Sequence, residues 1–320
     1  MFAVTAVRFD AENPISGLGL GEHAEPTPPD GWTTVTVKAA SLNHHDLWSL
    51  RGVGLSADRL PMILGCDAAG IDEDGNDVVV HAVIGDPSAG DETLDPSRSL
   101  LSERYDGTFA ERLTVPQRNL VPKPAALSFE EAACLPTAYL TAFRMLFDRA
   151  PVGPGSTVLV QGAGGGVATA LILLGRAAGY RMWATSRSEA KRQRALELGA
   201  DQVFETGARL PERVDAVMET VGEATWAHSL RALKPGGTVV ICGATSGSVP
   251  PADLTRIFFL QLSVIGSTMG TRDQLARLLT FCEQTGARPL IDRTMPLSQA
   301  ADGFAAMISG DLFGKVVFTA

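Results

Sequence analysis

The chain has few cysteines, no long hydrophobic run and no excess of positive charge. Its four cysteines, Cys66, Cys134, Cys242 and Cys282, lie far apart and form no C-x-x-C pair. This spacing excludes a disulfide framework and a compact structural metal cluster, and it indicates reduced thiols. With 27 basic residues against 36 acidic ones, the net charge is −9. Such a surface repels nucleic acid and anionic membranes, so neither is an expected partner.

The hydrophobic segments are too short for a membrane helix. The stretch 167–174, which contains Thr169, is well below the roughly 20 residues that span a bilayer. The first ten residues also lack the basic and apolar segments of a secretory signal. We therefore expect a soluble, cytoplasmic protein.

The length of 320 residues indicates two domains. In the first 120 residues, glycine and proline separate short apolar or alternating runs, at 3–9, 33–40, 78–84 and 109–115. Short runs between turn residues predict strands, so this part is expected to be β-rich, in the manner of a small barrel.

The pattern changes at Ser128, which predicts a helix N-cap followed by a helical segment to Phe147. After residue 155, strands alternate with helices, and this alternation predicts a doubly wound α/β domain with a parallel sheet. The expected strands are 157–161, 181–185, 214–219 and 238–242, and the expected helices are 167–178, 188–198 and 223–233, the last closed by 234–237. The tail adds helices at 273–283 and 298–308, an extended piece at 289–295 and a strand at 315–319, which is expected to return to the first domain. The predicted domains are 1–125, completed by 268–320, and 126–267.

A glycine-rich turn, 161–168, follows the first predicted strand of the second domain and opens a helix. In that context glycines let backbone amides approach a pyrophosphate, and the helix N-terminus presents its positive end. The spacing matches as Gly162-x-x-Gly165-x-x-Ala168, and a flexible hinge is the alternative interpretation. The expected cofactor contacts here are Gly162, Gly164, Gly165, Gly166 and Val167.

The end of the second strand of this domain indicates which coenzyme binds. A carboxylate there would bind the ribose 2′-hydroxyl, whereas its absence with a nearby arginine accommodates a 2′-phosphate. This chain has Ser186 and Arg187 at that place, with Lys191 behind them. The pattern favours NADPH, unless these basic residues only solvate a surface helix.

Four segments and the glycine turn together resemble the medium-chain dehydrogenase/reductase superfamily. The segments are 41–47 (SLNHHDL), 64–70 (LGCDAAG), 107–111 (GTFAE) and 233–237 (LKPGG). The resemblance implies a GroES-like catalytic domain, a Rossmann NADP-binding domain, an active site between them and a homodimer.

In zinc-dependent members of this superfamily, the ligand positions correspond to Asn43, Cys66 and Thr137, with Asp67 in place of a nearby glutamate. Asparagine and threonine are poor zinc donors. The cysteines of the family's structural zinc are also missing, because residues 86–106 contain none. The chain is therefore expected to bind no metal and is similar to the zinc-independent quinone oxidoreductases. A rescued zinc on Cys66, Asp67 and His44 or His45 is the alternative.

Without a metal, hydrogen-bond donors must stabilise the charge that hydride transfer leaves on the substrate oxygen. His45 is the first candidate acid, with Asn43 orienting the substrate, although a histidine that only supports its loop is an equal alternative. The resemblance places further cofactor contacts at His44, Thr137, Gly243, Ala244, Thr245, Gly266 and Ser267, and the substrate pocket at Trp48, Cys66, Asp67 and Tyr139. Trp48 replaces the tyrosine that is frequent in quinone oxidoreductases.

The sequence thus predicts a zinc-independent, NADPH-dependent oxidoreductase that transfers hydride to a quinone or an α,β-unsaturated carbonyl compound. Conjugation favours this substrate class because the negative charge spreads over an enolate. Two alternatives stay open: an alcohol or carbonyl dehydrogenase with an unusual or absent zinc, and a non-catalytic NADPH-binding sensor.

Overall fold

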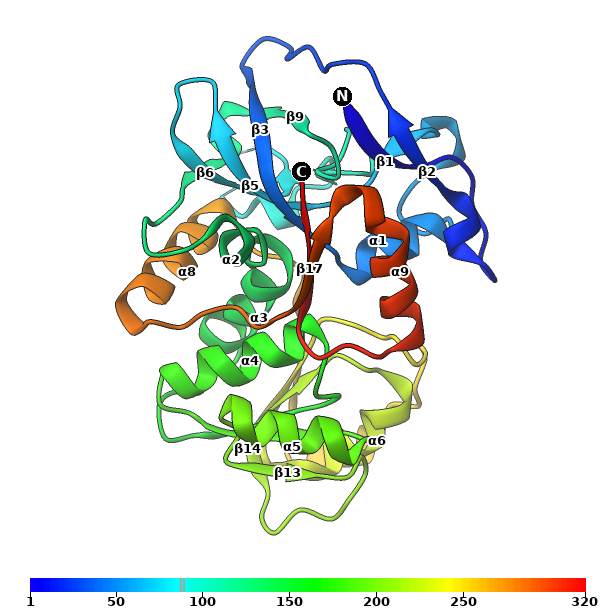
Figure 1. The fold of residues 1–320 in the computed structure, drawn as a ribbon. Coiled ribbons are helices and arrows are strands. Elements are labelled where there is room, and N and C mark those ends of the chain that lie inside the picture. The colour runs from blue at the N-terminus through cyan, green and yellow to red at the C-terminus, as the bar shows by residue number, and fades with distance from the viewer. Residues whose placement is uncertain (87, 89) are drawn as a thin grey trace. The chain divides into compact units, whose positions relative to one another are not determined.

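The computed structural model describes residues 1–86, 88 and 90–320 and consists of two compact units (Figure 1). Unit 1 comprises Met1–Leu140 and Met269–Ala320, and unit 2 comprises Thr141–Thr268. In the part of the chain that the structure describes, no helix is both long and apolar enough to cross a membrane.

Unit 1 is β-rich, as expected. Its largest sheet has the strand order β10-β6-β5-β3-β18-β17, with β9 also paired to β3, and a smaller sheet has the order β2-β1-β4. The strands are β1 (Phe2–Ala6), β2 (Leu18–Glu22), β3 (Trp32–Ser41), β4 (Met62–Ile63), β5 (Asp67–Asp72), β6 (Asp77–Val80), β7 (Val83–Ile84), β8 (Ser99–Leu100), β9 (Arg112–Pro116), β10 (Leu120–Pro122), β17 (Ile291–Pro296) and β18 (Lys315–Thr319). The helices are α1 (His44–Leu50), α2 (Phe129–Ala133), α8 (Arg272–Thr285) and α9 (Ala300–Ser309), and the chain from Leu135 to Leu140 continues α2 as a π-helical turn into α3 (Leu140–Arg144).

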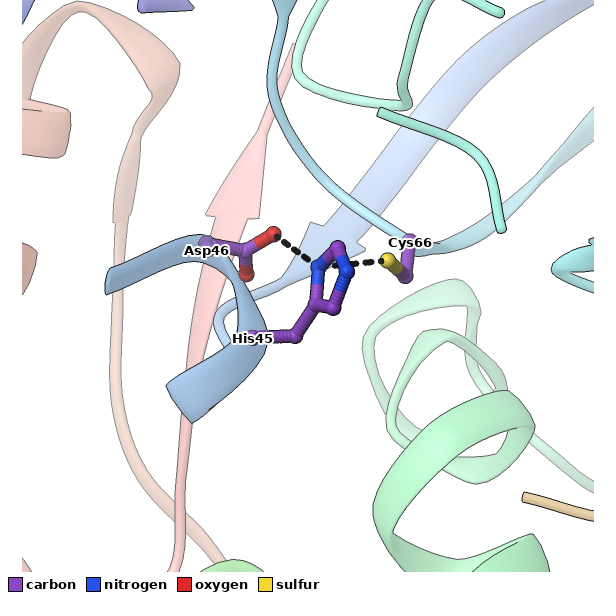
Figure 2. A group of neighbouring side chains, drawn as sticks. All are labelled: His45, Asp46 and Cys66. Carbon is purple, nitrogen blue, oxygen red and sulfur yellow. Dashed lines mark hydrogen bonds and ion pairs between the residues drawn. The ribbon is translucent and has the colours of Figure 1, made fainter. Parts of the chain in front are cut away.

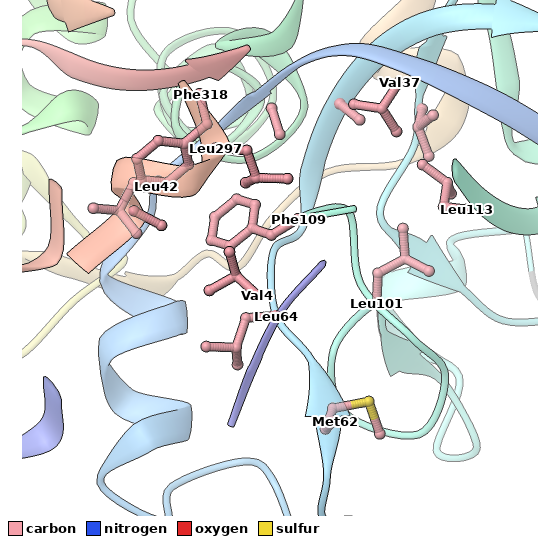
Figure 3. Packing of buried hydrophobic residues seen from close by; sticks show 14 of the residues in the cluster. Val4, Val37, Leu42, Met62, Leu64, Leu101, Phe109, Leu113, Leu297 and Phe318 are labelled. Carbon is pink, nitrogen blue, oxygen red and sulfur yellow. The ribbon is translucent and has the colours of Figure 1, made fainter. Parts of the chain in front are cut away.

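The C-terminal strand closes this unit. β18 runs antiparallel to β3, with Val317 opposite Ser41, so the predicted return of the tail to the first domain is confirmed. Phe318 of β18 packs edge-on against Phe109, with ring centroids 5.1 Å apart, inside the main hydrophobic core (Figure 3). The first unit is therefore completed by the last residues of the chain.

Unit 2 contains a parallel sheet with the order β13-β12-β11-β14-β15-β16. Numbered from β11, this is the 3-2-1-4-5-6 order of the Rossmann fold, so the predicted fold class is confirmed. The strands are β11 (Thr157–Val160), β12 (Arg181–Thr185), β13 (Gln202–Phe204), β14 (Val214–Glu219), β15 (Leu233–Ile241) and β16 (Ser263–Gly266). The helices are α4 (Gly166–Ala177), α5 (Glu189–Leu198), α6 (Glu223–Ala232) and α7 (Leu254–Phe259), and α4 packs beside α5.

Three details differ from the sequence pattern. The helical segment that begins at Ser128 packs with unit 1 as far as Leu140, because α2 lies against β3 and β5. The segment 234–237, expected to end a helix, is an irregular start of β15, where Gly236 has φ +75° and the pairing with β14 shifts register. The expected strand 78–84 is divided into β6 and β7.

Candidate functional site

The first candidate site lies at one edge of the sheet in unit 2. Parallel strands connected by helices all end at the same edge, and ligands of such sheets bind outside it where the strand order reverses. Here β11 and β14 are the neighbours at which the order reverses. The predicted cofactor residues follow the ends of β11, β12, β15 and β16, so the topology brings them to this edge.

The glycine turn has backbone angles that glycine allows. Gly162 has φ +78°, a backbone conformation that residues with a side chain rarely adopt. A Cβ there would also lie only 2.6 Å from Val221 Cγ2, so a larger residue would clash. Gly165 is exposed and a Cβ there would meet nothing, which leaves the N-terminus of α4 open to a ligand. Since the Thr169 amide makes the bond to the Gly165 carbonyl, the N–H groups of residues 166–168 have no acceptor within the helix.

A buried hydrogen-bond network supports this turn from below. Gln161 accepts a hydrogen bond of 2.6 Å from the Thr185 hydroxyl and donates to His228 Nδ1 at 2.9 Å and to Ser229 Oγ at 3.0 Å. Ser229 in turn donates to the buried carboxylate of Glu219 at 2.6 Å. His228 Nε2 lies 2.9 Å from the Ala208 carbonyl and must donate there, so Nδ1 is the acceptor for Gln161. The network fixes the loop between β11 and α4 through side chains of β12, β14 and α6.

The end of β12 carries no acid in the structure either. Ser186 is buried and its hydroxyl accepts the Ser188 N–H at 3.2 Å, while the Arg192 guanidinium donates to the Ser186 carbonyl at 2.8 Å. Arg187 is exposed, and its side chain makes no hydrogen bond or ion pair with any described residue. Lys191 lies in the first turn of α5. The arrangement offers positive charge and hydroxyl groups at the position that discriminates the two coenzymes.

The remaining predicted residues of unit 2 follow β15 and β16. Gly243 passes so close to β14 that a Cβ would lie 2.9 Å from the Thr220 carbonyl oxygen, and Ala244 and Thr245 are exposed beyond it. Gly266 ends β16, and the Ser267 hydroxyl is buried without a hydrogen-bond partner among the described residues. These backbone segments and the orphaned hydroxyl fit a bound nicotinamide dinucleotide, because buried polar groups are normally paired.

The second candidate site lies in unit 1, around the Asn43 amide. Lys315 Nζ is buried and donates to Asn43 Oδ1 at 2.6 Å and to the Leu42 carbonyl at 2.8 Å, with Asp67 Oδ2 at 3.5 Å. Asn43 Nδ2 donates to Asp67 Oδ2 at 2.8 Å and to the Ser41 carbonyl at 3.3 Å. Burial raises the pKa of Asp67, and the Lys315 ammonium and the Asn43 amide oppose that rise. The Asn43 side chain therefore has a partner for every polar atom.

His45, Asp46 and Cys66 form a second cluster in unit 1 (Figure 2). His45 Nε2 lies 3.1 Å from Glu103 Oε1 and Nδ1 lies 3.3 Å from Cys66 Sγ, with Asp46 Oδ1 at 3.9 Å. The Cys66 thiol donates to the Leu101 carbonyl at 3.3 Å, so its sulfur accepts from the ring. Both ring nitrogens thus face acceptors, which is the arrangement of a protonated imidazolium.

The charges in this cluster shift the pKa of His45 upward. Burial alone would lower the pKa, but Cys66, Asp46 and Glu103 outweigh it and raise the pKa well above 6.5. Burial raises the pKa of the Cys66 thiol, although His45 acts in the opposite direction. The hydrogen bond from His45 outweighs the burial of Glu103 and lowers the pKa of that carboxyl. Asp46 and Glu103 thus favour the protonated form of His45, which titrates together with the neighbouring Cys66 thiol.

The ligand positions of a family zinc do not fit a metal here. The Asn43 amide is held by Lys315 and Asp67, and the Thr137 hydroxyl is a weak donor. A different set, His45 Nδ1, Cys66 Sγ and an Asp46 oxygen, lies within 4.8 Å of one another. Asp46, however, already accepts the Asn43 N–H at 2.8 Å and the Gly65 N–H at 3.2 Å, at the start of α1.

The other predicted residues of unit 1 are dispersed. His44 is exposed on α1, and Trp48 is partly exposed one helical turn later, with the Arg51 guanidinium over its ring. Tyr139 is buried, and its hydroxyl accepts the Leu290 N–H at 2.8 Å, so it supports the unit from within. The Thr137 hydroxyl is buried, and it lies close enough to the Asp67 carboxyl to lower the pKa of that group. No observation tests the predicted roles, which stay predictions.

The sequence pattern missed Lys315, Glu103 and Arg192. Lys315 opens the terminal strand 272 residues after Asn43, and Glu103 lies 58 residues after His45, so no local spacing indicates either contact. A lysine at the start of an otherwise apolar strand was the available signal for a buried cation. Arg192 lies six residues after Ser186 and resembled a solvated helix residue.

Two family models match the chain, the first within unit 1 and the second over most of unit 2 and α8 of unit 1. Residues 29–125 match the alcohol dehydrogenase GroES-like domain, and residues 166–284 match the zinc-binding dehydrogenase model. The second match includes the N-terminus of α4 and the strands β12, β15 and β16, whose ends contribute to the first candidate site.

Individual proteins give the same result along the whole chain. The synaptic vesicle membrane protein VAT-1 homolog of Mus musculus is 30% identical over 325 residues, covering 91% of this chain and 77% of that protein. The quinone oxidoreductase of Mus musculus is 28% identical over 89% of this chain and 88% of its own length. A solved NAD-dependent alcohol dehydrogenase superposes with a TM-score of 0.93 at 33% identity, covering 100% of both chains. The chain therefore belongs to the medium-chain dehydrogenase/reductase superfamily of oxidoreductases.

Proposed function

We propose that this protein is a zinc-independent, NADPH-dependent oxidoreductase that transfers hydride to a quinone or an α,β-unsaturated carbonyl compound. The observation that carries the proposal is the state of Asn43. At a position where zinc-dependent relatives have a metal ligand, both atoms of its amide are held by a buried lysine and a buried carboxylate. A cation and an amide fill this place in the chain, which supports a mechanism in which protein hydrogen bonds, rather than a metal at Asn43, stabilise the charge on the substrate oxygen.

The coenzyme preference rests on the end of β12. A carboxylate about 4 Å from a 2′-phosphate would cost on the order of 4 kcal/mol per charge pair at an effective dielectric of about 20. Ser186 avoids this repulsion, and Arg187 adds an unpaired guanidinium suited to phosphate. The residues that would hold the dinucleotide are those of the glycine turn, Ser186, Arg187, Lys191, 243–245 and 266–267.

Bound NADPH supplies the hydride, and the chain's own residues supply position and protons. A conjugated acceptor spreads the resulting negative charge over an enolate, which lowers the demand for an electrophile. The His45 imidazolium holds a proton at Nδ1 and is our candidate donor to that enolate. Asn43 can contact a substrate oxygen by exchanging its longer bond, 3.3 Å to the Ser41 carbonyl.

We also propose a homodimer and a cytoplasmic location. β16 forms an edge of the parallel sheet, with Val264 45% exposed, and Phe258 and Phe259 of α7 before it are 64% and 75% exposed. An apolar edge strand with unpaired backbone groups is suited to pairing with a second copy. All four cysteines are free thiols, as is typical of a reducing compartment.

One observation favours a second candidate function, an alcohol or carbonyl dehydrogenase. The donor atoms of His45, Asp46 and Cys66 lie close enough together to hold a cation, and an alcohol dehydrogenase is among the similar solved structures. In this alternative a metal, rather than an imidazolium, would polarise the substrate oxygen. The two candidates make opposite predictions for metal content.

The first prediction concerns the coenzyme. Wild-type protein should bind NADPH more tightly than NADH in calorimetric titrations. Ser186→Asp should weaken NADPH binding by roughly 1,000-fold because it places a carboxylate beside the 2′-phosphate, and it should not weaken NADH binding, since a carboxylate there can bind the ribose 2′-hydroxyl. Arg181→Gln, at the other end of β12, is the control and should alter neither affinity. Tighter binding of NADH by the wild type would refute the coenzyme assignment.

The second prediction concerns zinc. Purified protein should contain far less than one zinc per chain by elemental analysis, and a chelator should leave NADPH oxidation unchanged. Stoichiometric zinc that disappears in Cys66→Ser and His45→Gln, but not in the control Cys242→Ser, would establish the dehydrogenase alternative instead.

The third prediction concerns His45. Its folded pKa lies above the ordinary 6.5, so its protonated form is favoured in the folded state. Protonation of His45 therefore stabilises the folded protein against unfolding. This contribution to the free energy of unfolding is fully present below about pH 6.5 and is lost as the pH rises through the folded pKa. The rate of NADPH oxidation should fall over the same range, because the proton donor is lost. His45→Gln should be slower and lack this pH dependence, whereas His23→Gln should keep it. A full rate in His45→Gln would remove His45 from the mechanism.

A further inference from the structure

Helix α1 has one face that is not used by the core. Asp46, Leu47, Ser49 and Leu50 point into unit 1 and are buried. The intervening positions His44, Trp48 and Arg51 are spaced by four and three residues, so they share the opposite face. His44 is exposed, and Trp48 and Arg51 are partly exposed. This face combines an imidazole, an indole and a guanidinium.

Arg51 is a cation without a counter-ion. Its guanidinium carbon lies 5.1 Å from the centre of the Trp48 ring, and its Nε is buried with no hydrogen-bond partner. Among residues 1–86, 88 and 90–320, no carboxylate forms an ion pair with it and no group accepts any of its hydrogen bonds. Arg112 of the same unit differs, since it pairs with Glu25. A buried donor without an acceptor is costly, and a ligand anion would remove that cost.

The surroundings of Arg51 are apolar. Trp48 lies beneath the guanidinium, and the Val53 N–H donates to the Trp48 carbonyl at 3.0 Å, which places Val53 beside the same turn. Val53 is 54% exposed, which is high for an apolar side chain. Stacking on Trp48 also holds the planar guanidinium in one orientation, which suits bidentate binding of a carboxylate. The features together fit a ligand with an apolar chain and an anionic end.

We propose that Arg51 binds a carboxylate of the substrate, so that the preferred substrates are amphipathic α,β-unsaturated carbonyl compounds that end in a carboxylate. The reaction in this inference rests on the proposed function, whereas the anion site does not. Asn43 and Arg51 flank the two ends of α1, so a rise of about 12 Å separates their backbones along the helix. In this proposal the substrate has a similar length, with its carbonyl at Asn43, its carboxylate at Arg51 and its chain against Trp48.

The test compares an acid with its neutral ester. The pair is a straight-chain enone of about ten carbons, a length set by the roughly 12 Å of helix, that ends in a carboxylate or in the methyl ester. Arg51→Gln should raise KM for the acid by roughly tenfold or more, because a charge-assisted hydrogen bond is lost, and should change KM for the ester by less than about twofold. The KM of Arg51→Lys for the acid should lie between those of the wild type and Arg51→Gln, since lysine keeps the positive charge but lacks the planar guanidinium that binds a carboxylate through two hydrogen bonds. Arg59→Gln is the control, because Arg59 already lies near Asp58.

A second readout separates this inference from the proposed reaction. Binding of the acid to coenzyme-free protein, measured by calorimetry, needs no turnover. Acid binding that Arg51→Gln abolishes supports the site even if neither compound is reduced, in which case only the proposed function fails. Equal effects on acid and ester, an unchanged KM for the acid, or a loss that appears only in NADPH affinity would each overturn the inference. The last result would assign Arg51 to a coenzyme phosphate.

Discussion

The parallel order of the strands in unit 2 is the constraint on which the account of coenzyme binding depends. Because β11, β12, β14, β15 and β16 all end at one edge, short segments from distant parts of the chain meet there. The amides of residues 166–168 face outward at this edge because the helix leaves them without acceptors. Gln161, locked between β12 and α6, holds the turn that presents them.

In unit 1, a buried charge organises the other candidate site. The Lys315 ammonium has three oxygen acceptors, from Leu42, Asn43 and Asp67, and it opposes the rise that burial causes in the pKa of the Asp67 carboxyl. The cation comes from the terminal strand, so unit 1 must be complete before Asn43 has its position. His45, Cys66 and Glu103 form a separate polar cluster, in which the two nitrogens of the imidazole lie against Cys66 and Glu103. A cationic group therefore lies in each of the two clusters, the Lys315 ammonium in one and the His45 imidazole, when protonated, in the other. A bound metal ion would be the other source of positive charge.

The sequence predicted features that depend on local patterns and missed those that depend on distant contacts. The strand 315–319, the strand 181–185 and the Ser128 cap were predicted correctly, because periodicity and capping act over a few residues. The predicted coenzyme contacts at Ser186 and Arg187 rest on their position relative to a strand, which is also local. The contact of Lys315 with Asn43 spans 272 residues, and the assignment of 128–140 to unit 1 depends on packing against β3 and β5. Neither contact can be predicted from the spacing of residues along the sequence.

The most direct test of the central claim is amide hydrogen exchange with and without NADPH. The account predicts that saturating NADPH slows exchange of the backbone amides in residues 162–168 and 186–188, since these groups would bond to the coenzyme phosphates. The start of β12, around Arg181, should exchange at the same rate in both states. Unchanged exchange in 162–168 under conditions where NADPH is bound would contradict the account, because the coenzyme would then lie elsewhere.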